Sequence, residues 1–145
     1  MKNLLKIVAV IAMAAFIAGC ISEEPEGVKI SGDLAYAVGS ADGNQPDIQT
    51  IFWKVNISNT GNVTAQNVTA DVMLHPKVLP RLRSFEEETV LLGNLPPRNT
   101  TGFNGTAKFN ATGLDKEDIA EWEPLVKIKV TWIEDGKMIE KILGE

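Results

Sequence analysis

The chain has 145 residues, of which 44% are hydrophobic and 23% are charged, and its formal net charge is −5. Nucleic-acid binding gains most of its affinity from lysine and arginine neutralising phosphates, so an acidic chain without a basic cluster argues against nucleic acid as a partner. The single cysteine, Cys20, leaves no pair of thiols for a disulfide and no thiolate set for a metal centre.

The first 20 residues have the composition of a secretory leader. Lys2 and Lys6 are the only charged residues before position 20, and residues 7–19 (IVAVIAMAAFIAG) form an uncharged, largely apolar run. A helix of that length would span only about 20 Å, whereas the hydrocarbon core of a bilayer is about 30 Å thick. The run therefore predicts a signal peptide rather than a permanent membrane span.

The leader ends in Ile17-Ala18-Gly19-Cys20, an aliphatic residue and two small residues before cysteine. This motif resembles the lipobox of prokaryotic lipoproteins. The resemblance implies that residues 1–20 act as a lipoprotein signal peptide, with removal of the leader before Cys20 and lipidation of its thiol. Diacylglycerol on Cys20 would supply the second acyl chain that stable anchoring needs. The expected location is extracytoplasmic, with the membrane as partner through this lipid. The alternative is a small buried cysteine at the end of an uncleaved helix.

Residues 21–27 (ISEEPEG) are acidic and contain almost nothing to bury. This composition predicts a short polar tether between the lipid and the domain. Its negative charge would be repelled by anionic headgroups, which would keep the domain off the membrane surface.

From residue 28 onward, apolar and polar residues alternate with the period of two that is typical of half-buried β-strands. The residues expected to face the core are, in chain order, Val28, Ile30, Leu34, Tyr36 and Val38; Ile51, Trp53, Val55 and Ile57; Val68, Ala70, Val72 and Leu74; Phe103, Ala107, Phe109 and Ala111; and Val126, Ile128, Val130 and Trp132.

Turn signals and shorter segments complete the pattern. Residues 59–62 (NTGN) predict a turn, and Asp135-Gly136 predicts a β-hairpin whose second strand is residues 138–143. A short strand is expected at residues 89–92. Residues 75–88 show no regular pattern and are expected to form an irregular connection.

One short helix interrupts the strands. Asp115 is suited to cap a helix over residues 116–122, and Leu114 with Ile119 fits a hydrophobic staple at its start. About seven strands and one short crossover helix predict an all-β, immunoglobulin-like antiparallel β-sandwich for residues 28–145. A Greek-key barrel is the alternative that strand patterns alone leave open. Without a disulfide, the three tryptophans and the aliphatic residues must hold the sheets together.

Three segments resemble a known class of module. They are FWKVNISNTGN (residues 52–62), AQNVTADV (residues 65–72) and LGNLPP (residues 92–97). Together they are similar to CARDB-type and related immunoglobulin-like modules of prokaryotic surface proteins, over most of residues 51–136. The resemblance implies adhesion, scaffolding or ligand display, and it brings no catalytic residues with it.

Asparagine-linked glycosylation sequons are more frequent than the composition explains. Chance predicts about one Asn-x-Ser/Thr sequon in the mature part of the chain. Exposed β-proteins contain some sequons that have no role in glycosylation, because threonine favours strands and asparagine favours turns. Every sequon falls on an outward strand position or in a turn, where a glycan can be accommodated. A lipobox together with many sequons is typical of archaeal envelope proteins. The six candidate sites are Asn56, Asn62, Asn67, Asn99, Asn104 and Asn110.

Candidates for catalysis or metal binding are few. His75 is the only histidine, and no nucleophile motif accompanies it. Met73 and His75 share a strand parity and could contact one soft metal ion, but a core methionine beside an edge histidine is the stronger interpretation. Glu86, Glu87 and Glu88 are expected to form a solvated loop. We therefore predict no catalytic residue, no metal site and no cofactor.

Arg81, Arg83 and Phe85 form the one predicted loop in which basic and apolar side chains mix. Arginine and aromatic residues are enriched at binding hot spots, so these three residues are candidates for partner contact. A plain connecting loop is the alternative.

Two classes of function compete. The first is a non-catalytic, lipid-anchored cell-envelope module that binds or scaffolds other envelope proteins or glycans at the outer face of the membrane. The second is an accessory or solute-binding subunit of a membrane transport or redox complex. A hydrolase is a third possibility, but nothing in the sequence places two acidic side chains in one cleft.

Overall fold

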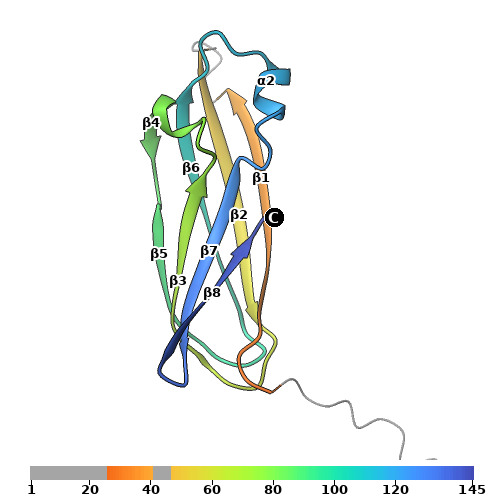
Figure 1. Ribbon diagram of the computed structural model, residues 1–145, viewed down its shortest axis with the longest axis vertical. Coiled ribbons are helices and arrows are strands. Elements are labelled where there is room, and N and C mark those ends of the chain that lie inside the picture. Colours follow the sequence, from red (N-terminus) through yellow and green to blue (C-terminus); the bar gives the residue numbers. More distant parts are fainter. Residues whose placement is uncertain (1–25, 41–46) are drawn as a thin grey trace, which may run out of the picture.

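The computed structural model describes residues 26–40 and 47–145 (Figure 1). The predicted leader, Cys20 and most of the predicted tether lie outside these residues. Within them the chain forms eight strands, a single 3-10 turn and one short α-helix. The elements are β1 (Ile30–Ser40), β2 (Ile48–Asn59), β3 (Ala65–Leu74), η1 (Leu79–Arg81), β4 (Leu82–Phe85), β5 (Thr89–Leu95), β6 (Thr100–Asn110), α2 (Lys116–Ala120), β7 (Val126–Glu134) and β8 (Lys137–Leu143).

The strands form two four-stranded antiparallel sheets, in the orders β1-β2-β6-β4 and β5-β3-β7-β8. The first order corresponds to strands A, B, E and D of an immunoglobulin domain, and the second places an additional strand beside the equivalents of C, F and G. The helix α2 carries the chain from β6 in one sheet to β7 in the other (Figure 1). The predicted immunoglobulin-like β-sandwich with a short crossover helix is therefore confirmed.

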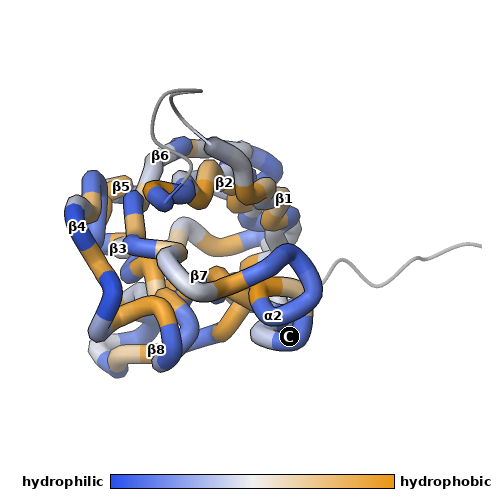
Figure 2. The backbone as a smooth tube through the Cα atoms, turned by 90° about the horizontal axis from the view of Figure 1, so that it is seen from above, coloured by the Kyte–Doolittle hydropathy of each residue, from blue (hydrophilic) through white to orange (hydrophobic). Residues whose placement is uncertain are grey.

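The packed interior follows the predicted alternation. Viewed along the strands, hydrophobic and hydrophilic positions alternate along the tube in two layers (Figure 2). In β2 the four predicted inward residues are at most 2% exposed, and those of β3 and β7 are buried as well. Trp53, Trp122 and Trp132 all belong to the buried core, as expected for a sandwich without a disulfide.

Several details differ from the sequence-based expectations. The stretch expected to be irregular contains η1 and β4, so there is one strand more than the approximate seven. The strand β4 has a register shift against β6. It is only four residues long, which is too short for a period of two to be recognised in the sequence. The helix ends at Ala120 rather than at residue 122. Met73 is 41% exposed on the outer face of its sheet and is not a core residue.

The end of the sandwich at which β1 begins is called the base here, and the opposite end, which carries η1 and α2, is called the tip (Figure 1). At the base, the amide of Gly27 donates to Asn62 Oδ1 at 2.8 Å, and the amide of Val28 donates to Glu134 Oε1 at 2.7 Å. The Gly27 carbonyl in turn accepts from the Asn62 amide at 3.1 Å. Among the described residues, hydrogen bonds to the rest of the domain begin at Gly27, the last position of the predicted tether.

Buried Asn59 organises the base. Its side-chain amide donates to the carbonyls of Val63 at 2.7 Å and Leu95 at 3.0 Å. Its Oδ1 accepts from the amides of Lys29 at 3.2 Å and Gly61 at 3.0 Å. All the usual hydrogen-bonding capacity of an asparagine amide is used, so one side chain ties the start of β1 to the β2–β3 turn and to the end of β5.

Candidate partner-binding surfaces

No group of three or more histidine, cysteine, aspartate or glutamate side chains capable of holding a metal ion occurs in residues 26–40 and 47–145. His75 stacks on Trp122, with ring centroids 6.3 Å apart and an angle of 11° between the planes, and Lys77 Nζ lies 5.7 Å from the centroid of the same ring. His75 Nδ1 accepts from the amide of Lys77 at 3.2 Å. These contacts give His75 a structural role, since it covers a core tryptophan next to α2.

The three predicted contact residues Arg81, Arg83 and Phe85 take different positions. Phe85 turns into the sandwich, where its ring meets that of Trp53 edge to face at a centroid distance of 5.9 Å. Half-buried Arg81 donates through Nη1 to the carbonyls of Asn110 and Thr112, both at 3.3 Å. Arg83 is exposed beside a hollow of about 200 Å³ that Arg81 and Asn110 also line. Of the three, Arg83 is the one whose side chain is exposed for a partner to reach.

Arg81 is bonded to the domain and Arg83 is exposed, so substitutions at the two positions should affect stability differently. We expect Arg81→Glu to lower the free energy of unfolding by about 1–2 kcal/mol, because two carbonyls lose their donor and a carboxylate replaces it. Arg83→Glu should change the free energy of unfolding by less than about 0.5 kcal/mol. Urea unfolding monitored by tryptophan fluorescence measures both. Equal stability of the two variants would contradict the structural role of Arg81.

The six candidate glycosylation sites are all accessible to solvent. Five of the asparagines are exposed and Asn110 is half-buried. Asn62 and Asn110 accept hydrogen bonds through Oδ1, from the amides of Gly27 and Thr112, both at 2.8 Å. A glycan is attached through the amide nitrogen, so these bonds leave the reacting atom available. Asn56 and Asn104 are diagonal neighbours in the β2–β6 ladder, so glycans there would share one patch of the outer sheet face.

That patch contains a hollow that sequence analysis did not predict. It has a volume of about 620 Å³ and lies around the outward side chains of Phe52, Lys54, Asn56 and Asn104. Phe52 is 46% exposed there. Because both asparagines belong to sequons, glycosylation would cover this hollow.

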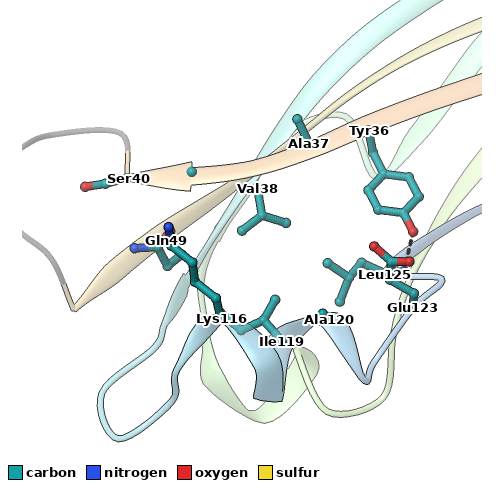
Figure 3. A pocket seen from close by; sticks show the side chains of 11 residues that line it. Tyr36, Ala37, Val38, Ser40, Gln49, Lys116, Ile119, Ala120, Glu123 and Leu125 are labelled. Carbon is teal, nitrogen blue, oxygen red and sulfur yellow. Dashed lines mark hydrogen bonds between the residues drawn. The ribbon is translucent and has the colours of Figure 1, made fainter.

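A groove of about 590 Å³ lies between the tip half of β1 and α2 (Figure 3). Apolar side chains of both walls line it, namely Tyr36, Val38, Ile119, Ala120 and Leu125. Polar side chains stand at its margins, namely Ser40, Gln49, Lys116 and Glu123. Tyr36 and Val38 pack against the core as predicted. They are only half-buried, because β1 is an edge strand and its inner face opens into this groove.

The wall of the groove opposite β1 is built by local sequence. Asp115 caps α2 by accepting from the Asp118 amide at 2.8 Å, and the Asp118 carboxylate accepts from the Asp115 amide at 3.0 Å, which is a capping box. Leu114 and Ile119, the residues of the predicted staple, both pack on the core.

The segment after α2 is fixed to both sheets. The Leu125 amide donates to Tyr36 Oη at 3.4 Å, and the Leu125 carbonyl accepts from the amide of His75 at 2.9 Å. The groove is therefore held open by its own hydrogen bonds and packing. It could not be predicted from the sequence, because its two walls are about 80 residues apart in the chain and no motif links them.

No protein-family model matches the chain, and no curated protein matches it. Among solved structures, a Bordetella pertussis protein described as ApaA aligns over 82% of this chain and 91% of its own, with 13% identity and a TM-score of 0.44. The structural genomics target SoR45 aligns over 81% and 82%, with 11% identity and a TM-score of 0.39. An uncharacterized β-sandwich protein from Clostridium difficile 630 aligns over 86% and 88%, with 8% identity and a TM-score of 0.24. Similarity at this level carries no function to this chain.

The described ranges contain no helix with the length and apolarity needed to cross a bilayer.

Proposed function

We propose that this chain is a non-catalytic, lipid-anchored module of a prokaryotic, archaeal-type cell envelope that binds other envelope components at the outer face of the membrane. The observation that carries the proposal is that the first described residues and the groove lie at different ends of the domain. The first described residues lie at the base, and α2 with its groove lies at the tip (Figure 1).

This arrangement suits display away from a membrane. Gly27 is seven positions beyond Cys20, and a chain of that length can reach at most about 25 Å. The base would then face the lipid. A strand of 12 residues such as β2 spans about 40 Å, so the groove near the tip would project outward. Accessible sequons at the base, on one sheet face and near the tip are consistent with a glycosylated surface protein.

The resemblance to CARDB-type modules supports the same proposal, because it implies adhesion, scaffolding or ligand display. The described residues form an immunoglobulin-like sandwich, which is the fold that the resemblance implies. His75 stacks on Trp122 and its Nδ1 accepts from the Lys77 amide, which supports a structural role for the one histidine.

A solute-binding or accessory subunit of a membrane complex is the second candidate. The observation that favours it is the volume of the groove, about 590 Å³, which lies within the range of about 300–1,000 Å³ that is typical of small-molecule sites. Binding of a polypeptide or of a solute in the groove distinguishes the two candidates.

The anchor is tested with Cys20→Ser in the native host, with Ser22→Ala as the matched control. We expect wild-type protein and the control to enter the detergent phase on phase partitioning, and Cys20→Ser to remain in the aqueous phase, because two acyl chains supply the membrane affinity. Intact-mass analysis of the membrane-extracted protein should give a chain that begins at Cys20 with added lipid, and it also reports any glycan. A chain that begins at Met1 with a free thiol and stays in the cytosol would refute the anchor and the placement.

A further inference from the structure

One side of β1 has no strand partner among the described residues, because β1 is the edge strand of its sheet. The register with β2 shows which groups point that way. The Thr60 amide donates to the Lys29 carbonyl at 2.8 Å, so odd-numbered residues of this segment exchange hydrogen bonds with β2. The even-numbered residues, whose side chains face the interior, direct their amide and carbonyl groups to the edge. The Ile30 carbonyl agrees with this assignment, since it accepts from Lys141 Nζ at 2.8 Å.

The base half of this edge is covered by the end of β8. Lys141 occupies the Ile30 carbonyl, a Cβ at Gly32 would lie 2.6 Å from a methyl carbon of Leu143, and a Cβ at Gly144 would lie 2.7 Å from a methyl carbon of Leu34. Tyr36, the next inward residue after Leu34, lines the groove. The edge-facing amides and carbonyls of Tyr36 and Val38 therefore lie beside the apolar surface of the groove.

The groove has opposite charges at its two ends. Lys116 lies toward Val38 and the end of β1, whereas Glu123 lies below Tyr36 and Leu125 (Figure 3). Both charged residues are exposed. These charges would orient an occupant that runs along the groove and carries an acidic group at the Lys116 end and a basic group at the Glu123 end.

We propose that the groove binds an extended segment of a partner protein by β-strand addition to Tyr36–Val38. The segment adds antiparallel to β1, which is the more stable pairing. It places alternate apolar side chains against Ile119 and Ala120, with an acidic residue before them and a basic residue after them. Hydrogen bonds to the strand edge supply affinity and the pocket supplies specificity, as in other domains that bind peptides between a strand and a helix.

A polypeptide fits these features better than a solute does. A small solute needs only the pocket, whereas edge amides and carbonyls that repeat along a strand beside it match the backbone of an extended chain. None of the six sequon asparagines belongs to β1, to α2 or to residues 116–125, so glycosylation leaves the groove accessible. The inference rests on the proposed function only in naming the class of envelope partner, because the binding itself does not require the lipid.

The test uses the full chain in detergent and a fluorescent, end-blocked peptide Glu-Thr-Val-Thr-Val-Thr-Lys, with fluorescence anisotropy as the measurement. We expect a dissociation constant of the order of 100 µM. The peptide with its two charged residues exchanged should bind about threefold more weakly, because each rim ion pair contributes little. In the double variant Lys116→Glu, Glu123→Lys this preference should reverse.

Two further comparisons separate strand addition from other modes. Two peptides are compared, one methylated on the backbone amides of its odd positions and one on those of its even positions. One of them should lose about tenfold or more in affinity and the other should lose little, because only one set of amides faces β1. Ala120→Trp fills the groove and should abolish binding, whereas Ala35→Trp, on the outward side of the same strand, should not.

No binding at 1 mM peptide, or equal binding of both methylated peptides, would overturn the inference, as would a dimer in sedimentation equilibrium that occupies the groove with a second copy. These results leave the lipid-anchor test unaffected. Loss of the anchor in that test likewise leaves the peptide result unaffected, so the two proposals fail separately.

Discussion

Replacing Asn59 by aspartate is expected to lower the free energy of unfolding by about 3 kcal/mol. Aspartate keeps the shape of asparagine and can still accept from Lys29 and Gly61. It cannot donate, so the carbonyls of Val63 and Leu95 lose their partner and face a carboxylate oxygen instead. An unpaired buried polar group costs about 1–3 kcal/mol, and burial of a charge adds to this cost.

The matched control is Asn94→Asp, near the same end of the domain. Asn94 is exposed, and its Oδ1 accepts from the Asn67 amide at 3.0 Å, a bond that aspartate preserves. Neither residue is part of a sequon, so neither change alters glycosylation. Urea unfolding of both variants gives the comparison, with a change below about 0.5 kcal/mol expected for the control. If the two variants were equally stable, the hydrogen bonds of Asn59 would not hold the base together.

Asn59 also shows what local patterns can and cannot reveal. The run of residues 59–62 predicted a turn, and the chain does turn there. The hydrogen bonds that make Asn59 indispensable reach Lys29 and Leu95, which are 30 and 36 residues away in sequence. A turn signal describes a preference of the local backbone. It contains no information on which distant carbonyls will surround the side chain.

The strands were predictable where they are long and buried on one face. In β2 the alternation of Ile51, Trp53, Val55 and Ile57 is complete, and the structure buries all four residues. The strand β4 escaped prediction because four residues with a register shift cannot establish a period. Met73 follows the polar parity of β3, yet its apolar side chain favoured the core interpretation. Parity was the better guide than residue type, since it fixes the face of the sheet.

The candidate sites were less predictable than the fold. Arg81, Arg83 and Phe85 are close in sequence, but Phe85 packs on Trp53 and Arg81 binds two carbonyls, so adjacency did not produce one surface. The groove arises in the opposite way, from segments far apart in sequence. Its strand wall was assigned to the core because Tyr36 and Val38 alternate correctly. Edge position, which exposes them, is a property of the sheet order and is not encoded in the pattern of any one strand.

The interior of the first sheet depends on a residue that has no side chain. Gly105 lies opposite Trp53 in the β2–β6 ladder, and the indole occupies the space where a β-carbon would be. A Cβ at Gly105 would lie 2.6 Å from Cζ2 and 2.8 Å from Cε2 of Trp53. Trp53 is only 2% exposed and its ring meets that of Phe85, so it has little room to move. The ring belongs to the buried core, to which residues of both sheets contribute.

We therefore expect Gly105→Ala to lower the free energy of unfolding by about 2 kcal/mol, because the added methyl group overpacks a closed interior. Gly39→Ala is the control in another strand of the same sheet. A Cβ there meets nothing within 4 Å, so the change should be neutral or stabilise by up to about 0.5 kcal/mol. Near-ultraviolet circular dichroism adds a specific readout, since only Gly105→Ala should alter the tryptophan signal. The Asn104 sequon survives the substitution, so a loss of stability cannot come from a lost glycan. An unchanged spectrum and unchanged stability would show that the indole of Trp53 does not rest on Gly105.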